Sequence, residues 1–156
     1  MNRNGSGSKK KAQEIHVWTY DEAKKAVPYI SSIMRSLRDQ RLEAQSLQRQ
    51  VGLLEKKPGR PDRTALLAQA EVKRQAGEAE GRFDDSLREL FGLDIFCIDP
   101  ITGQAMIPFL RAEKLAWFVF DLFDEEDHLK QWRYHDDAME KRRPIAEALA
   151  EPPVTV

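Results

Sequence analysis

Residues 92–109 read GLDIFCIDPITGQAMIPF, and the pattern of the chain changes at this stretch. Before it, apolar residues recur at the three- and four-residue spacing of amphipathic helices. After Gly92, a residue type that often follows the end of a helix, they fall into short runs. The runs cover residues 93–98, 105–109 and 115–123. Pro100 and Gly103 favour a hairpin connection between the first two runs, because proline presets φ and glycine readily adopts positive φ.

This change of pattern predicts an α+β protein with one folded domain at residues 15–146. A long antiparallel helical hairpin is expected at 19–91, followed by a small antiparallel β-meander at 92–146. Residues 1–14 are polar and then basic, so we expect a disordered tail there. A loose C-terminal tail is expected at 147–156.

Helix-end signals fix the ends of the two hairpin helices. Thr19 and Glu22 have the spacing of a capping box at the start of the first helix. Pro28 is expected to kink this helix or to split off its first turns, because proline has no amide hydrogen. The sequence Pro-Gly-Arg-Pro then ends the helix, and Asp62 or Thr64 can cap the second one.

One apolar face of the first helix is the expected association surface. Its residues are Ile30, Ile33, Leu37, Leu47, Val51 and Leu54. The face would bind a second copy of the chain, giving a homodimer, or helices of another protein. The alternative is that Val72, Leu87 and Leu90 of the second helix bury it within the monomer. Beyond Gln40 the second helix offers mainly alanine, so we expect the seam there to need a partner or to fray.

The segment 125–143 admits two interpretations. A helix would have Asp124 as its cap and would place Leu129, Trp132, Asp136 and Met139 in one stripe. A strand at 128–134 would instead complete the meander. The spacing of the residues alone slightly favours the helix.

A second candidate site lies in this segment and would bind an anionic or planar ligand. Its residues are Trp132, Arg133, His135, Asp136 and Arg142. The competing interpretation is structural, with Trp132 in the core and an internal salt bridge between Arg142 and Asp136. His128 and Asp137 add metal-ligand residue types, but there is no HExxH or CxxC spacing, so neither a metal nor a cofactor is expected. No serine or cysteine has a histidine beside it, and the sequence therefore leans against catalysis.

Composition limits the classes of partner. The 156 residues carry 25 Lys+Arg and 26 Asp+Glu, a net charge of -1, which gives no broad positive field for nucleic acid or an anionic membrane. Nucleic-acid binding would rest on the basic tail and Lys56, Lys57, Arg60 and Arg63, and it is not expected. No apolar run approaches the about 20 residues of a membrane span. The single cysteine, Cys97, is expected to be a buried thiol. With one cysteine and no secretory signal, the chain is expected to be cytoplasmic.

Several short motifs together resemble a known family. They are WTYDEA at 18–23, Val27-Pro28, GLDI at 92–95, Asp99-Pro100 to Gly103, Ile107-Pro108, and Trp132, Asp136, Arg142 and Pro144. On these residues the chain resembles the bacterial family known as domain of unknown function 2203. The resemblance implies a helical hairpin followed by a small antiparallel sheet, favours a strand at 129–134, and implies no activity. The chain looks like a divergent member, since Arg133 stands where the closing pattern has His.

Together these features predict a small cytoplasmic protein that works as a non-catalytic interaction or scaffold module through its helical hairpin. The alternative is a small-molecule or metal-binding domain, or an enzyme, with a site on the C-terminal sheet.

Overall fold

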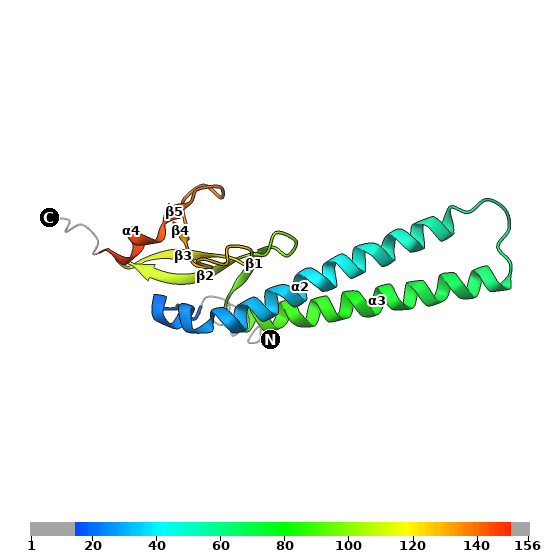
Figure 1. Ribbon diagram of the computed structural model, residues 1–156, viewed down its shortest axis with the longest axis horizontal. Coiled ribbons are helices and arrows are strands. Elements are labelled where there is room, and N and C mark those ends of the chain that lie inside the picture. Colours follow the sequence, from blue (N-terminus) through cyan, green and yellow to red (C-terminus); the bar gives the residue numbers. More distant parts are fainter. Residues whose placement is uncertain (1–14, 151–156) are drawn as a thin grey trace, which may run out of the picture.

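A computed structural model describes residues 15–150 (Figure 1). Helices α2 (Tyr20–Glu55) and α3 (Arg63–Phe91) lie side by side and antiparallel, and they form a long hairpin. A five-stranded antiparallel sheet packs on the hairpin at the end away from the connecting loop. The predicted α+β fold, a helical hairpin followed by a β-meander, is confirmed. The tail expected at 1–14 lies outside the described residues.

Helix α2 begins at the predicted capping box. The Thr19 hydroxyl accepts from the Glu22 amide at 3.1 Å, and the Glu22 carboxylate accepts from the Thr19 amide at 2.9 Å. The helix then continues through Pro28, so its first turns are not split off. Ala23 and Ile30, both fully buried, pack the turns on either side of Pro28 against the core and offset the missing hydrogen bond.

Helix α3 begins at Asp62, whose carboxylate accepts from the Ala65 amide at 2.8 Å, so Asp62 and not Thr64 is the cap. At the other end Gly92 is the cap but keeps an ordinary right-handed backbone, with φ -62°. The left-handed residue that turns the chain toward the sheet is Asp94, with φ 59°.

The sheet is a simple meander in which each strand pairs with the next one along the chain. Its strands are β1 (Phe96–Asp99), β2 (Gln104–Arg111), β3 (Lys114–Asp121), β4 (Gln131–Tyr134) and β5 (Arg143–Pro144). Segment 125–143 is therefore strand plus turn, and the helical interpretation was wrong. Pairing with β3 decides this, because it places Trp132 opposite Phe118 in the core. A short helix, α4 (Ile145–Leu149), follows β5 where the sequence predicted a loose tail from 147. Ile145 and Ala148 pack against the core, which orders it.

The buried residues form two separate clusters. The larger one lies between the hairpin and the inner face of the sheet, and its largest fully buried side chains include Trp132, Phe118, Phe120 and Ile30. The smaller one lies farther along the hairpin and consists of Ala44, Leu47, Ala76 and Ala79, with Val72 packed against it. Figure 1 shows the hairpin extending well beyond the sheet, with the two helices separating toward their loop. The far half of the hairpin therefore has only a thin, alanine-rich core.

Candidate functional site

The sheet residues predicted to bind a ligand do not share one surface. Trp132 is fully buried in the core, where its indole nitrogen donates to the Pro144 carbonyl at 3.0 Å. Arg133, the next residue of β4, points to the opposite face and is only 3% exposed. Its guanidinium donates to the Asp137 carbonyl and to the Met106 sulfur. Neighbouring residues on a strand face opposite ways, so Trp132 and Arg133 cannot contact one small ligand.

The other three predicted residues also have separate surroundings. His135 is exposed and accepts a hydrogen bond through Nδ1 from the Trp117 indole at 3.2 Å. Asp136 is exposed and lies 4.0 Å from the Lys114 amine. Arg142 donates to backbone carbonyls within its own turn. The predicted ligand-binding set is therefore not brought together.

A salt bridge does close this part of the sheet, but it lies one residue along from the predicted pair. Arg143 holds both carboxylate oxygens of Asp137 at 2.9 Å, whereas Arg142 and Asp136 are not paired. The same carboxylate accepts from the Tyr134 amide at 2.8 Å. The Arg143 guanidinium and this amide hold the pKa of Asp137 well below its usual range. This arrangement fastens the last turn and leaves no open group for chemistry.

Metal binding finds no support among the described residues. Within 15–150, no group of three or more His, Cys, Asp or Glu side chains could hold an ion. Cys97 is half-buried, and burial raises the pKa of its thiol to about 11, so little of the reactive thiolate is expected at neutral pH.

The hairpin residues predicted as an association surface are largely inside the monomer. Ile30, Ile33, Leu37 and Leu47 are between 0% and 8% exposed. Only Val51 and Leu54, toward the loop, are partly exposed. Helix α3 and the sheet cover this face, so these four residues are buried within the chain and form no outer surface.

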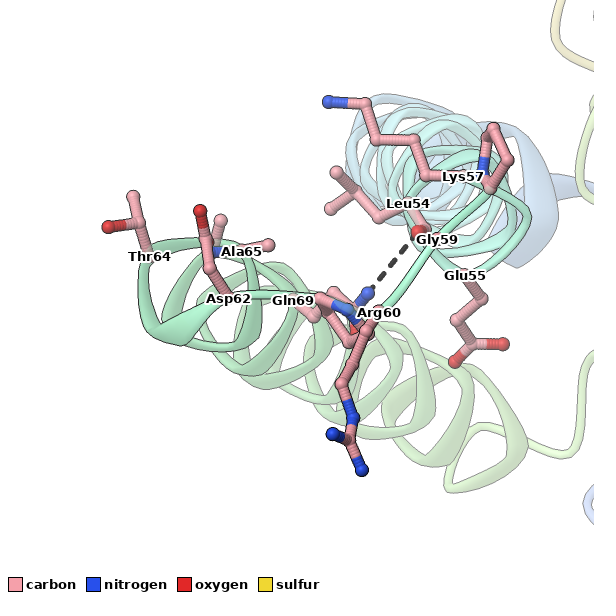
Figure 2. Close-up of a pocket in the computed structure, with 12 residues that line it drawn as sticks. Leu54, Glu55, Lys57, Gly59, Arg60, Asp62, Thr64, Ala65 and Gln69 are labelled. Carbon is pink, nitrogen blue, oxygen red and sulfur yellow. Dashed lines mark hydrogen bonds between the residues drawn. The ribbon is translucent and has the colours of Figure 1, made fainter.

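The open surface lies instead at the far end of the hairpin. A pocket of about 500 Å³ opens where the helices meet their loop (Figure 2). Its apolar lining comes from Leu54, Ala65 and Ala68, and the Gln69 side chain crosses between the helices to donate to the Leu54 carbonyl at 3.2 Å. Figure 2 shows Lys57 extending from the α2 side of this pocket.

Exposed leucines and basic side chains lie close to this pocket in the sequence, and of them only Lys57 and Arg60 line it. Leu53, Leu66 and Leu67 are 71%, 52% and 60% exposed. The basic residues near the loop are Lys56, Lys57, Arg60 and Arg63, and all are exposed. The nearby acids are already engaged, Glu55 with Lys73 at 3.0 Å and Asp62 as the cap of α3. We call the three leucines and four basic residues, with the pocket, the distal surface.

Analysis of the sequence missed the leucines of this surface. These three leucines lie outside the apolar seam, so the spacing of the seam does not predict them. The sequence did contain a signal for this surface: leucines that lie off the seam, next to the basic Pro-Gly-Arg-Pro loop. Such leucines are not covered by the facing helix, so they predict an exposed apolar patch.

A long antiparallel helical hairpin that carries a five-stranded meander, with no metal cluster in residues 15–150, defines an α+β protein of simple architecture. The chain belongs to the family described as "Uncharacterized conserved protein (DUF2203)", whose model matches residues 16–145. The family resemblance noted from the short motifs is thus confirmed. No curated protein and no solved structure matches the chain. Neither long helix in the described range has the continuous apolar length that crossing a membrane requires.

Proposed function

We propose that this protein is a non-catalytic, cytoplasmic interaction module that binds another protein through the distal surface of its helical hairpin. The observation that carries the proposal is the combination of an open pocket with three exposed leucines at the end of the hairpin. Exposed apolar residues that group together on a surface often mark protein–protein contacts.

The chemistry of the distal surface specifies the kind of partner. Lys56, Lys57, Arg60 and Arg63 give it local positive charge, while Glu55 and Asp62 are engaged in contacts of their own. An amphipathic helix that carries leucine-like side chains flanked by carboxylates would satisfy both features, because its apolar stripe fills the pocket and its acids meet the basic rim. We therefore propose an acidic, amphipathic helical segment of another protein as the occupant.

The thin core beneath this surface supports the same proposal. The core near the loop has four buried residues, and three of them are alanines: Ala44, Leu47, Ala76 and Ala79. The two helices there bury little apolar area against each other and gain little stability from it. A partner helix packed against both would bury additional apolar area at about 25 cal/mol per Å². Binding would then stabilise the part of the molecule that its own core stabilises least.

Site-specific photocrosslinking in cells tests the proposal. A photoreactive residue replaces Leu67, which is 60% exposed, and the matched control replaces Leu110, which is 56% exposed on the sheet. We expect a discrete adduct at 67 and none at 110. The adduct, identified by mass spectrometry, should contain an acidic amphipathic segment.

Surface variants then show whether the adduct depends on the proposed chemistry. Leu53→Glu should reduce the adduct at 67 about tenfold, the effect of a loss of about 1.4 kcal/mol. Leu110→Glu should leave it unchanged. An adduct that is insensitive to Leu53→Glu, or a partner whose contact segment is basic, would contradict the proposal. A cross-link to a second copy of the chain would instead indicate the homodimer expected from the sequence.

A further inference from the structure

A second pocket lies at the opposite end of the molecule from the distal surface. Its volume is about 260 Å³, and it is open to solvent beside the first turn of α2. Six of its lining residues are Trp18, Thr19, Phe109, Arg111, Phe118 and Leu149. They come from the start of α2, from β2 and β3, and from α4, which Figure 1 shows gathered at the end away from the hairpin loop. Four elements, some of them distant in the sequence, thus build one small cavity.

Arg111 is the unusual residue of this pocket, because its charge is buried and no described residue, 15 to 150, supplies a countercharge. Its side chain sits at the end of β2 and the residue is 9% exposed, and its Nε atom is buried with no hydrogen-bond partner. The guanidinium makes one long hydrogen bond, 3.5 Å, to the Ala150 carbonyl, and lies 5.2 Å from the Trp132 ring. Within residues 15–150, no carboxylate forms a salt bridge with it. Burying a charge is unfavourable unless the charge is paired, so this arrangement calls for an anion.

The surroundings of Arg111 favour a negative group with a flat apolar body. Phe109 and Phe118 are stacked with ring centroids 3.9 Å apart, and Trp18 adds a third aromatic side chain to the lining. Thr19, the N-terminal cap of the 36-residue helix α2, also lines the pocket, and the positive end of a helix dipole attracts anions. Asp21 and Glu22 lie in the same turn but are exposed, and Glu22 is held by Thr19 in the capping box. The positive charge inside the pocket therefore comes mainly from Arg111.

We propose that this pocket binds a small organic anion, with a carboxylate or phosphate group on Arg111 and a single flat ring or short apolar chain against Phe109 and Leu149. Its volume is slightly below the usual range for drug-sized ligands, which limits the occupant to a molecule of about one ring. The proposal does not depend on the distal surface, since the two sites share no residue.

Titration followed by two-dimensional amide NMR tests this inference on the full chain. The probes are benzoate, phenyl phosphate, inorganic phosphate and the neutral benzamide. We expect saturable shifts for the amides of 18–20, 109–111 and 148–149 with benzoate or phenyl phosphate, and at least about tenfold weaker binding of benzamide, equivalent to about 1.4 kcal/mol. Stronger binding of phenyl phosphate than benzoate would assign a phosphate ligand, and the reverse order a carboxylate.

Two sets of variants connect the binding to Arg111. Arg111→Met should abolish the shifts while leaving a folded spectrum. Because loss of a buried arginine can disturb folding, Leu149→Glu provides a second test at an exposed position, 54% accessible. Its carboxylate at the mouth of the pocket should pair with Arg111 and weaken benzoate at least about tenfold, whereas the matched neutral variant Leu149→Gln should not.

Three results would overturn the inference. They are benzamide binding as tightly as benzoate, shifts that do not include residues 109–111, and no saturable binding of any anion. Glu151→Gln tests whether a carboxylate of the chain itself pairs with Arg111, because Glu151 directly follows Ala150 in the sequence. Anion binding seen only in Glu151→Gln would mean that the chain supplies its own carboxylate, and the proposal of an external ligand would be wrong.

Discussion

Replacing Gly103 with alanine should destabilise the protein strongly, and the structure allows the size of the effect to be worked out. Gly103 connects β1 and β2 with φ +73°, in the left-handed region. A side chain there costs about 1–2 kcal/mol in conformational energy. An added Cβ would also lie 2.6 Å from Leu122 Cβ, in a residue that is 4% exposed, and such overpacking costs about 1–3 kcal/mol. We expect Gly103→Ala to lower the free energy of unfolding by about 2–5 kcal/mol.

The same chemical change should have the opposite sign in α3. Gly81 lies in the exposed middle of that helix, and a Cβ added there meets nothing within 4 Å. Gly81→Ala should therefore stabilise the protein by about 0.5–1 kcal/mol. Gly103→Asn separates the two contributions at the turn, because asparagine tolerates the left-handed region but still brings the clashing Cβ. It should remain destabilised by about 1–3 kcal/mol.

Urea unfolding measures all three variants, with far-UV circular dichroism reporting the helices and tryptophan fluorescence reporting the sheet. With a slope of about 2 kcal/mol per M, Gly103→Ala should lower the midpoint by about 1–2.5 M. The reasoning would be refuted if Gly103→Ala stayed within 1 kcal/mol of the parent. It would also fail if alanine at 103 and at 81 shifted the midpoint in the same direction.

Three further predictions concern the sheet. Trp132→Ala should destabilise the protein by about 3–5 kcal/mol in the same urea assay, because the ring is core; little change would indicate a surface ligand residue instead. Since Arg143 lowers the pKa of Asp137 in the folded state, the pair stabilises the protein above the ordinary carboxylate pKa and is lost as pH falls below about 4. In Asp137→Asn the thermal unfolding midpoint should therefore depend less on pH in this acid range. The same pH dependence in the variant and the parent would contradict the role of this ion pair. Because its pKa is raised to about 11, Cys97 should react with iodoacetamide at pH 8 far more slowly in native protein than in urea; equal rates would show an exposed thiolate.

The helical hairpin could be predicted because its signals are local. The capping box at Thr19, the cap at Asp62 and the three- and four-residue spacing each act within one turn of helix, and all are present in the structure. Pro28 could not be judged locally. Its missing hydrogen bond is outweighed by the burial of Ala23 and Ile30, which depends on contacts with distant parts of the chain.

The sheet was predicted less well because its details depend on register. In segment 125–143 the helical spacing of Leu129 and Trp132 was real, but both residues reach the core from a strand and its preceding loop. The salt bridge was placed at Arg142 and Asp136 instead of Arg143 and Asp137. A shift of one residue on a strand or tight turn moves a side chain to the other face, and nothing in the sequence fixes which of two adjacent arginines points inward.

Most of the residues predicted as an association surface are buried, for a different physical reason. An apolar stripe shows that a helix face is covered, but it does not show what covers it. Here α3 and the sheet cover Ile30, Ile33 and Leu37 within one chain. The distal surface and the Arg111 pocket combine residues from separate elements, and only the folded structure brings them together.

The separation of the two buried clusters gives the molecule a gradient of mechanical and local stability along its long axis. The base is held by large aromatic side chains from both the helices and the sheet, whereas the far cluster is mainly alanine. Opening of the loop end breaks few buried contacts and leaves the base intact. We therefore expect amide hydrogens near the loop to exchange through local opening, and those of β2 and β3 to exchange only through global unfolding. For the same reason, we expect the spacing of the two helix ends near the loop to change more readily than the sheet at the base.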